Sequence, residues 1–382
     1  MQNIVVIAAG GGNDIFSAIA YINSQLKNKN YPNYALLGIL GLTPFHTNEE
    51  MISNSLNIEH PIIVPSANMK RYLVMHPPKQ IYATESLLPE IIESSAPYIK
   101  HYACISPKYS AIEQADNINK LLQSWGFYAA DTIINIVDFG GDILSNGKQS
   151  TIISPELDAF TLAVVRNMTQ YKSYLSVCFP GVDGELDNEY LREMCEQIAY
   201  DGEDVNVDLW KQELEGIYNK IKHYRAGNTI PNMLKVIDGE KLVNINKYVV
   251  IGKQRYNINS QINIDINLQS RIYYFDIKFS NPYVNIFNSD SYDLMELLKH
   301  INSIYSNQCI NDNSNQMSDL FLQYLRPDVN GLYTNKHLII NDSDNIQKVI
   351  YVNILPYQLR DNSECLTLIK ELTTYDDLYL SD

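Results

Sequence analysis

Three short segments of this 382-residue chain place glycines and acidic side chains directly after a run of apolar residues. The first is Gly10–Asp14, which follows the apolar run Ile4–Ala9. Glycines let backbone N–H groups approach a phosphate closely, and the positive end of a following helix favours an anion. The segment therefore predicts a phosphate-binding turn between a strand and a helix, with Gly10, Gly11 and Gly12 as its binding residues.

The residues that end this turn have a second interpretation. The spacing matches neither the dinucleotide pattern G-x-G-x-x-G nor the P-loop pattern, and no lysine follows to reach a terminal phosphate. A glycine-rich turn can also be only a tight connection, in which Asn13 or Asp14 caps the following helix. If the turn binds a ligand instead, Asn13 is a candidate ligand-binding residue and Asp14 a candidate catalytic residue.

The second segment, Ile133–Leu144, repeats this order of apolar run, glycines and acids. Ligands of open α/β sheets bind outside the carboxyl ends of the strands, so loops from different strands converge on one crevice. We expect Gly140 and Gly141 to admit a sugar or pyrophosphate, with Asp138 and Asp142 near a ribose hydroxyl or a reacting centre. Alternatively, Asp138 ties down the backbone of its own loop.

The third segment is Pro180–Leu186, which follows another predicted strand and contains Asp183 in an Asp-Gly turn. Asp183 is a candidate binding residue, although turn chemistry alone also accounts for it. Glu156 and Asp158 lie in the first turn of a helix predicted to begin at Pro155, where acids favour the helix N-terminus electrostatically.

Composition excludes several classes of function. The formal net charge is −15, which argues against nucleic acid or an anionic membrane as the main partner. Five scattered cysteines predict neither a disulfide scaffold nor a zinc site, whereas Mg²⁺ held by aspartates stays open. The N-terminal apolar run lacks the basic residues of a secretory signal, so we expect a soluble protein of a cytoplasmic-type, reducing compartment, without membrane insertion.

The fold class follows from alternating strand-like and helix-like patterns over residues 1–230. They predict an α/β domain with a mostly parallel sheet flanked by helices, a three-layer Rossmann-like or macrodomain-like arrangement. Strands are expected near residues 4–9, 34–40, 61–64, 102–105, 132–138 and 174–179. Helices are expected at 112–125, 188–200 and 207–224.

Residues 231–382 have a different character, rich in Asn, Ile and Tyr with period-two stretches. We interpret them as an α+β extension, which either forms its own unit or completes the first sheet. Strands are expected at 271–279 and 349–354, and a helix at 292–305. The acidic end, 371–382, is expected to be a solvated tail.

The three motifs together, G-G-G-x-D, D-x-G-G-D and P-G-x-D-G-E-L, are similar to those of an uncharacterised bacterial and archaeal family. Within that group the chain resembles divergent macrodomain-like ADP-ribosylglycohydrolases that intracellular bacteria use as effectors. The resemblance covers roughly the first 200 residues and implies that Ala8–Asp14 holds the diphosphate and distal ribose of ADP-ribose. The chain differs from ordinary macrodomains in lacking their N-A-A-N loop. The resemblance further implies delivery into a host cell and an ADP-ribosylated protein as the partner.

The activity implied by this resemblance is hydrolysis of an N-glycosidic ADP-ribose linkage, on arginine because acidic loops attract a cationic leaving group. Asp14 and Asp142 are then the catalytic pair, one orienting the ribose hydroxyls and the other positioning water or the guanidinium. No cofactor is required, and ADP-ribose is the ligand or product. The alternatives are a non-catalytic module that binds ADP-ribose or a nucleotide sugar, a phosphotransferase dependent on Asp and Mg²⁺, and a structural scaffold.

Overall fold

The structure is a computed structural model. It describes residues 2–11, 13–29, 31–39, 62–63, 74–76, 79–81, 84–105, 110–146, 155–222, 229–251, 254–281, 284, 336–341 and 347–352. The helix expected at 292–305, the acidic tail and Gly12 lie outside the described residues.

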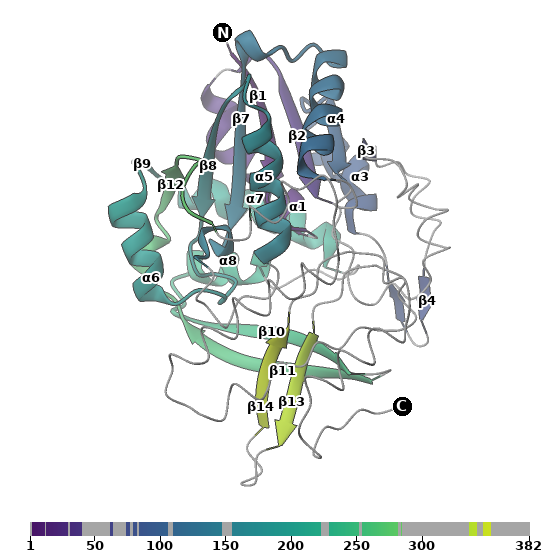
Figure 1. Cartoon of the computed structure of the whole chain (residues 1–382). Coiled ribbons are helices and arrows are strands. Elements are labelled where there is room, and N and C mark those ends of the chain that lie inside the picture. The colour runs from purple at the N-terminus through teal and green to yellow at the C-terminus, as the bar shows by residue number, and fades with distance from the viewer. Residues whose placement is uncertain are drawn as a thin grey trace.

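The main sheet contains eight strands in the order β3-β6-β2-β1-β7-β8-β12-β9 (Figure 1). Their bounds are β1 (Asn3–Ala8), β2 (Tyr34–Ile39), β3 (Ile62–Ile63), β6 (His101–Ile105), β7 (Thr132–Phe139), β8 (Lys172–Cys178), β9 (Asp201–Asp204) and β12 (Arg271–Phe275). The five central strands, from β6 to β8, run parallel. The outer pairs β3 with β6, β12 with β8 and β9 with β12 are antiparallel.

Helices cover both faces of this sheet, so the expected three-layer α/β fold with a mostly parallel sheet is confirmed. Side chains of β1 alternate between two cores: Ile4 and Val6 face one, and Val5 and Ile7 face the other. The first core includes α1 (Asp14–Tyr21), α3 (Leu88–Ser95), α7 (Val207–Ile221) and α8 (Thr229–Ile237). The second includes α4 (Ala111–Ser124), α5 (Pro155–Asn167) and α6 (Asn188–Glu193).

Three two-stranded sheets accompany the main one among the described residues. They pair β4 (Val74–His76) with β5 (Lys79–Ile81), β10 (Leu242–Ile251) with β11 (Gln254–Asn263), and β13 (Lys336–Asn341) with β14 (Gln347–Val352). In the part of the chain that the structure describes, every helix is too short or too polar to span a bilayer.

The order of the strands creates a switch point between β1 and β7. From β1 the chain proceeds through β2 to β6 on one side, whereas β7 and β8 extend the sheet on the other. Ala8 at the end of β1 is in register with Val137 of β7, and the N–H of Ala9 donates to the carbonyl of Val137 at 2.8 Å. The loops that follow β1 and β7 therefore leave the sheet side by side, at the place where open α/β sheets bind ligands.

Most expected elements in the first 230 residues are present within a few residues of their predicted bounds. The helix predicted at 188–200 differs, because α6 ends at Glu193 and continues as a π-helical turn, Met194–Ile198. In the C-terminal region, the strand expected at 271–279 is β12, which ends at Phe275 and lies in the main sheet between β8 and β9.

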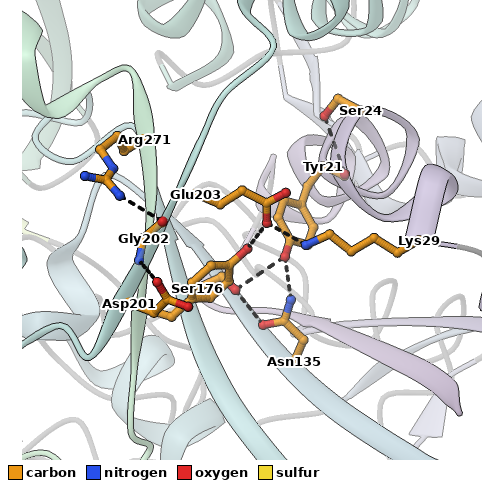
Figure 2. A network of polar contacts seen from close by, with 10 residues as sticks. Tyr21, Ser24, Lys29, Asn135, Ser176, Asp201, Gly202, Glu203 and Arg271 are labelled. Atoms are coloured by element: carbon orange, nitrogen blue, oxygen red, sulfur yellow. Dashed lines mark hydrogen bonds and ion pairs between the residues drawn. The ribbon is translucent and has the colours of Figure 1, made fainter.

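A buried polar network fixes α1 against the centre of the sheet. The amide nitrogen Nδ2 of Asn135 in β7 donates to the hydroxyl of Tyr21 in α1 at 2.8 Å, and the hydroxyl of Ser176 in β8 donates to Oδ1 of Asn135 at 2.8 Å. Figure 2 shows these three side chains pointing toward one another. Buried polar groups stabilise a fold only when they are paired, so the network favours one position of α1 against the sheet.

Candidate functional site

The turn after β1 brings together carboxylates from both layers of helices. Gly10 has a φ of +73°, and a Cβ placed on it would lie 2.5 Å from Oδ2 of Asp14 and 3.3 Å from Oδ1 of Asp158. Asp14 begins α1 on one face of the sheet, while Asp158 lies in the first turn of α5 on the other. The missing side chain at Gly10 is thus what allows the two carboxylates to approach the same backbone.

Three aspartates meet beside this turn. Carboxylate oxygens of Asp138, Asp142 and Asp158 all lie within 4.8 Å of one another. Asp138 is the seventh residue of β7, Asp142 begins the short 3₁₀ helix Asp142–Leu144, and all three side chains are at least nine-tenths buried. Oxygen donors at such spacing are the ligands that hard divalent cations prefer.

Asp138 also organises the loop after its strand. Burial raises the pKa of Asp138 to about 7, against hydrogen bonds from Asp142 and from the backbone N–H groups of Gly141, Phe139 and Ile143, which lower it. Its Oδ2 atom is buried without a hydrogen-bond partner. The alternative in which Asp138 ties down its own loop is therefore present in the structure, and one oxygen remains for another ligand.

The third loop is hydrogen-bonded to the second through Gly140. The N–H of Gly140 donates to the carbonyl of Cys178 at 3.1 Å, and the N–H of Gly181 donates to the carbonyl of Gly140 at 2.5 Å. A Cβ on Gly140 would lie 2.0 Å from Oδ2 of Asp183, whose Oδ1 accepts the N–H of Glu185 at 3.0 Å. Asp183 thus fills the space beside Gly140.

These bonds change the expected role of two glycines. We expected Gly140 and Gly141 to admit a sugar or pyrophosphate. In the structure their N–H groups have protein acceptors, the Cys178 carbonyl and the Asp138 carboxylate respectively. The physical reason is that a carboxylate in the chain can occupy the same backbone donors that a phosphate would use.

Burial, together with repulsion among the acids, sets the electrostatics of the site. Burial raises the pKa of Asp14 well above its usual value, and the nearby carboxylates of Asp138, Asp183, Glu185 and Glu85 raise it further.

Two further aspartates show the same effect. Burial raises the pKa of Asp142 and of Asp158, and repulsion from neighbouring acids adds to both. Like charges held this closely in a dry site require either bound protons or a cation.

Backbone conformations at these strand ends are also unusual. Phe179, directly after β8, has a φ of +50°, which non-glycine residues rarely adopt. Positive φ values gather in the same loops, at Gly10, Gly140, Gly141, Gly181 and Gly184. Positive φ strains the backbone at Phe179, not at the glycines, and strain of this kind concentrates at functional sites.

The structure brings together most of the acids singled out from the sequence: Asp14, Asp138, Asp142 and Asp183. Asn13 precedes α1 but its side chain makes no capping bond, and its Nδ2 atom is buried without a partner. Gly11 is half-buried in the turn.

Sequence reasoning missed three acids of the site. Asp158 was interpreted as a helix N-terminal charge, and Glu85 and Glu185 were not singled out as site residues. The signal for Glu185 was its place in the P-G-x-D-G-E-L motif. For Glu85, in the 3₁₀ helix Thr84–Leu87, we find no signal in the sequence.

Comparison with known proteins adds a family likeness. No curated protein matches the chain. Residues 64–241 match a family described as "Protein of unknown function (DUF1152)". The matched segment contains six of the seven acids described above, all except Asp14, and it spans slightly under half of this chain's length. The central part of the chain, from Val64 to Lys241, is thus similar to that family.

Proposed function

We propose that this protein is a hydrolase that releases ADP-ribose from a modified arginine side chain of another protein. The observation that supports the proposal is the meeting of Asp14 and Asp142 with further buried carboxylates at the switch point of the sheet. A site lined by acids attracts a guanidinium and favours the positive charge that develops on the ribose.

The chemistry assigns different tasks to the two acids. The bond from ribose C1″ to the guanidinium nitrogen breaks, and its electron pair moves to that nitrogen. Asp14, which begins α1 beside the Gly10 turn, takes a proton from the water that adds to C1″. Asp142, nearly buried next to Asp138 and Asp158, orients the ribose hydroxyls.

A second candidate is hydrolysis or transfer of a phosphoryl group with the help of a divalent cation. The specific observation in its favour is the set of three oxygen ligands from Asp138, Asp142 and Asp158. The N–H groups of Gly140 and Gly141 already donate to the Cys178 carbonyl and the Asp138 carboxylate. This argues against a phosphate that is bound by the backbone of the second loop alone.

The experiment is product analysis with a protein ADP-ribosylated on arginine. We expect free ADP-ribose to be released by the wild-type chain. Loss of one acid-base group lowers rates by about 10²-fold or more, which we expect for Asp14→Asn and Asp142→Asn. The control is Asp116→Asn, which makes the same change of charge on the exposed face of α4.

The outcomes separate the candidate functions. Binding of the modified protein without release would replace the proposal with a non-catalytic module. Release of phosphate from a nucleotide, with no free ADP-ribose, would replace it with the phosphoryl reaction. Equal release by the wild type and both site variants would remove Asp14 and Asp142 from the mechanism.

A further inference from the structure

We propose that Asp138, Asp142 and Asp158 bind one divalent cation, such as Mg²⁺, Mn²⁺ or Ca²⁺, at the carboxyl ends of β1 and β7. This inference deepens the proposed function by naming what holds the ribose hydroxyls or the diphosphate. Cation binding itself does not rest on that function, and it is tested below without substrate.

The spacing of the ligands fits one cation. Bonds from oxygen are about 2.1 Å long for Mg²⁺ and about 2.4 Å for Ca²⁺, so oxygens on opposite sides of the ion lie about 4.2–4.8 Å apart. One oxygen each from Asp138, Asp142 and Asp158 lies within 4.8 Å of the others. The three side chains come from a strand, a short 3₁₀ helix and an α-helix, so the fold itself sets their separation.

The second observation is that two of the three aspartates each have a buried oxygen without a hydrogen-bond partner. Oδ2 of Asp138 and Oδ1 of Asp158 are fully buried and accept no hydrogen bond, although each residue is only 2% exposed. Oδ1 of Asp158 lies beside the Gly10 turn, 3.3 Å from the position that a Cβ on Gly10 would take. Buried carboxylate oxygens without partners are costly, and a cation supplies the missing interaction.

Charge around the site leads to the same conclusion. Besides its three ligands, the site is surrounded by Asp14, Asp183 and Glu185, whose charges act on Asp142 or its neighbours. An anionic ligand such as a diphosphate would be repelled from this cluster. A divalent cation offsets two of the negative charges and offers the remaining coordination positions to ligand oxygens.

The test is calorimetric titration of the chelator-treated full chain with MgCl₂, MnCl₂ and CaCl₂ alone. We expect about one cation per chain for at least one of the metals. Loss of an outer-shell partner commonly costs 10–100-fold in metal affinity, so loss of a direct ligand in Asp158→Asn or Asp142→Asn should cost at least about tenfold. Asp116→Asn on exposed α4 makes the same charge change and should bind like the wild type.

Two further measurements distinguish loss of cation binding from misfolding of a variant. Circular dichroism is expected to show native secondary structure for both site variants. The unfolding temperature of the wild type and of Asp116→Asn should rise with the cation, whereas that of Asp158→Asn should not.

Two results would overturn the inference. One is a wild-type chain that binds none of the three metals at millimolar concentration. The other is binding of several cations per chain that Asp158→Asn leaves unchanged, which would assign it to the acidic surface of a protein with net charge −15. Neither result depends on whether ADP-ribose is a substrate.

Discussion

Substituting Gly10 by alanine, with Gly126→Ala as the control, tests whether function depends on the shape of the site or only on the stability of the fold. Gly10 has a φ of +73°, and Gly126, the second residue after the end of α4, has a φ of +84°. A left-handed conformation costs an alanine about 1–2 kcal/mol, so both substitutions carry a similar backbone penalty. Their surroundings differ, because a Cβ on Gly126 meets nothing within 4 Å, whereas one on Gly10 lies 2.5 Å from Oδ2 of Asp14.

The contact at Gly10 can be relieved by turning the Asp14 side chain. Forcing a side chain about 30° from its rotamer costs about 0.5–1.5 kcal/mol. Gly10→Ala should therefore lower the free energy of unfolding by about 1.5–3.5 kcal/mol, and Gly126→Ala by about 1–2 kcal/mol. Only Gly10→Ala moves a carboxylate of the site, and it also places a methyl group 3.3 Å from Oδ1 of Asp158.

The assays are urea unfolding, ADP-ribose release and cation titration on both variants. We expect Gly126→Ala to keep wild-type release and cation affinity, and Gly10→Ala to lose at least tenfold in release. If both variants lost function in proportion to their stability, the turn would be only a structural connection. Full function in a folded Gly10→Ala would show that Asp14 need not lie against this backbone.

Three further predictions follow from other contacts. Gly140→Ala should lower the free energy of unfolding by more than about 2 kcal/mol in urea titrations, because φ is +124° and the new Cβ would lie 2.0 Å from Oδ2 of Asp183. A loss below about 1 kcal/mol would contradict this expectation. Tyr21→Phe removes the hydroxyl that accepts a hydrogen bond from Asn135 Nδ2, so it should lower the free energy of unfolding by about 1–3 kcal/mol. The control Tyr128→Phe changes an exposed tyrosine and should leave the free energy of unfolding unchanged. Equal effects of the two substitutions would show that the buried network does not stabilise the fold. In chelated protein, the pKa of Asp138 is raised to about 7, so the folded state holds a proton that the unfolded state loses near pH 4. The free energy of unfolding should therefore fall as the pH rises from about 4 to about 7, and a rise across that range in thermal unfolding would contradict the sign.

The fold was predictable because local signals and tertiary structure agree in the first 230 residues. Apolar runs such as Ile133–Val137 are too hydrophobic for an exposed strand, and glycines end them, so a buried parallel sheet is the consistent solution. The place of β12 was not predictable. Its sequence, Arg271–Phe275, shows that it is a strand but carries no information about which edge of which sheet it joins.

The candidate site was predictable in part, for a related reason. Asp138 near the end of β7 and Asp142 three residues after that strand are close because they are close in sequence, and the parallel pairing of β1 with β7 brings Asp14 to the same end of the sheet. Asp158 is different, since it reaches the site only because α5 packs over the second face with its first turn above the end of β1. A helix N-terminal acid looks the same in sequence whether it faces solvent or a buried cluster.

The glycine pattern shows a second limit of sequence. Strand, glycines and acid predicted backbone donors for a phosphate, and the donors are present after β7. The N–H of Gly141 donates to the carboxylate of Asp138 in the same loop, because a carboxylate, like a phosphate, is an anion that suits clustered N–H donors. Spacing alone does not tell an internal anion from a bound one.

The acid cluster is best explained by function, because it opposes stability. Burying one carboxylate without a cation is unfavourable, and burying three within 4.8 Å of one another is more so. The same loops contain Phe179 at its unfavourable positive φ, so the unfavourable features share one location, at the ends of the central strands. Such a concentration at the switch point of the sheet is typical of a functional site and supports the proposed one. Selection for stability alone would not account for buried carboxylates and a strained residue at the switch point, which is where open α/β sheets bind ligands.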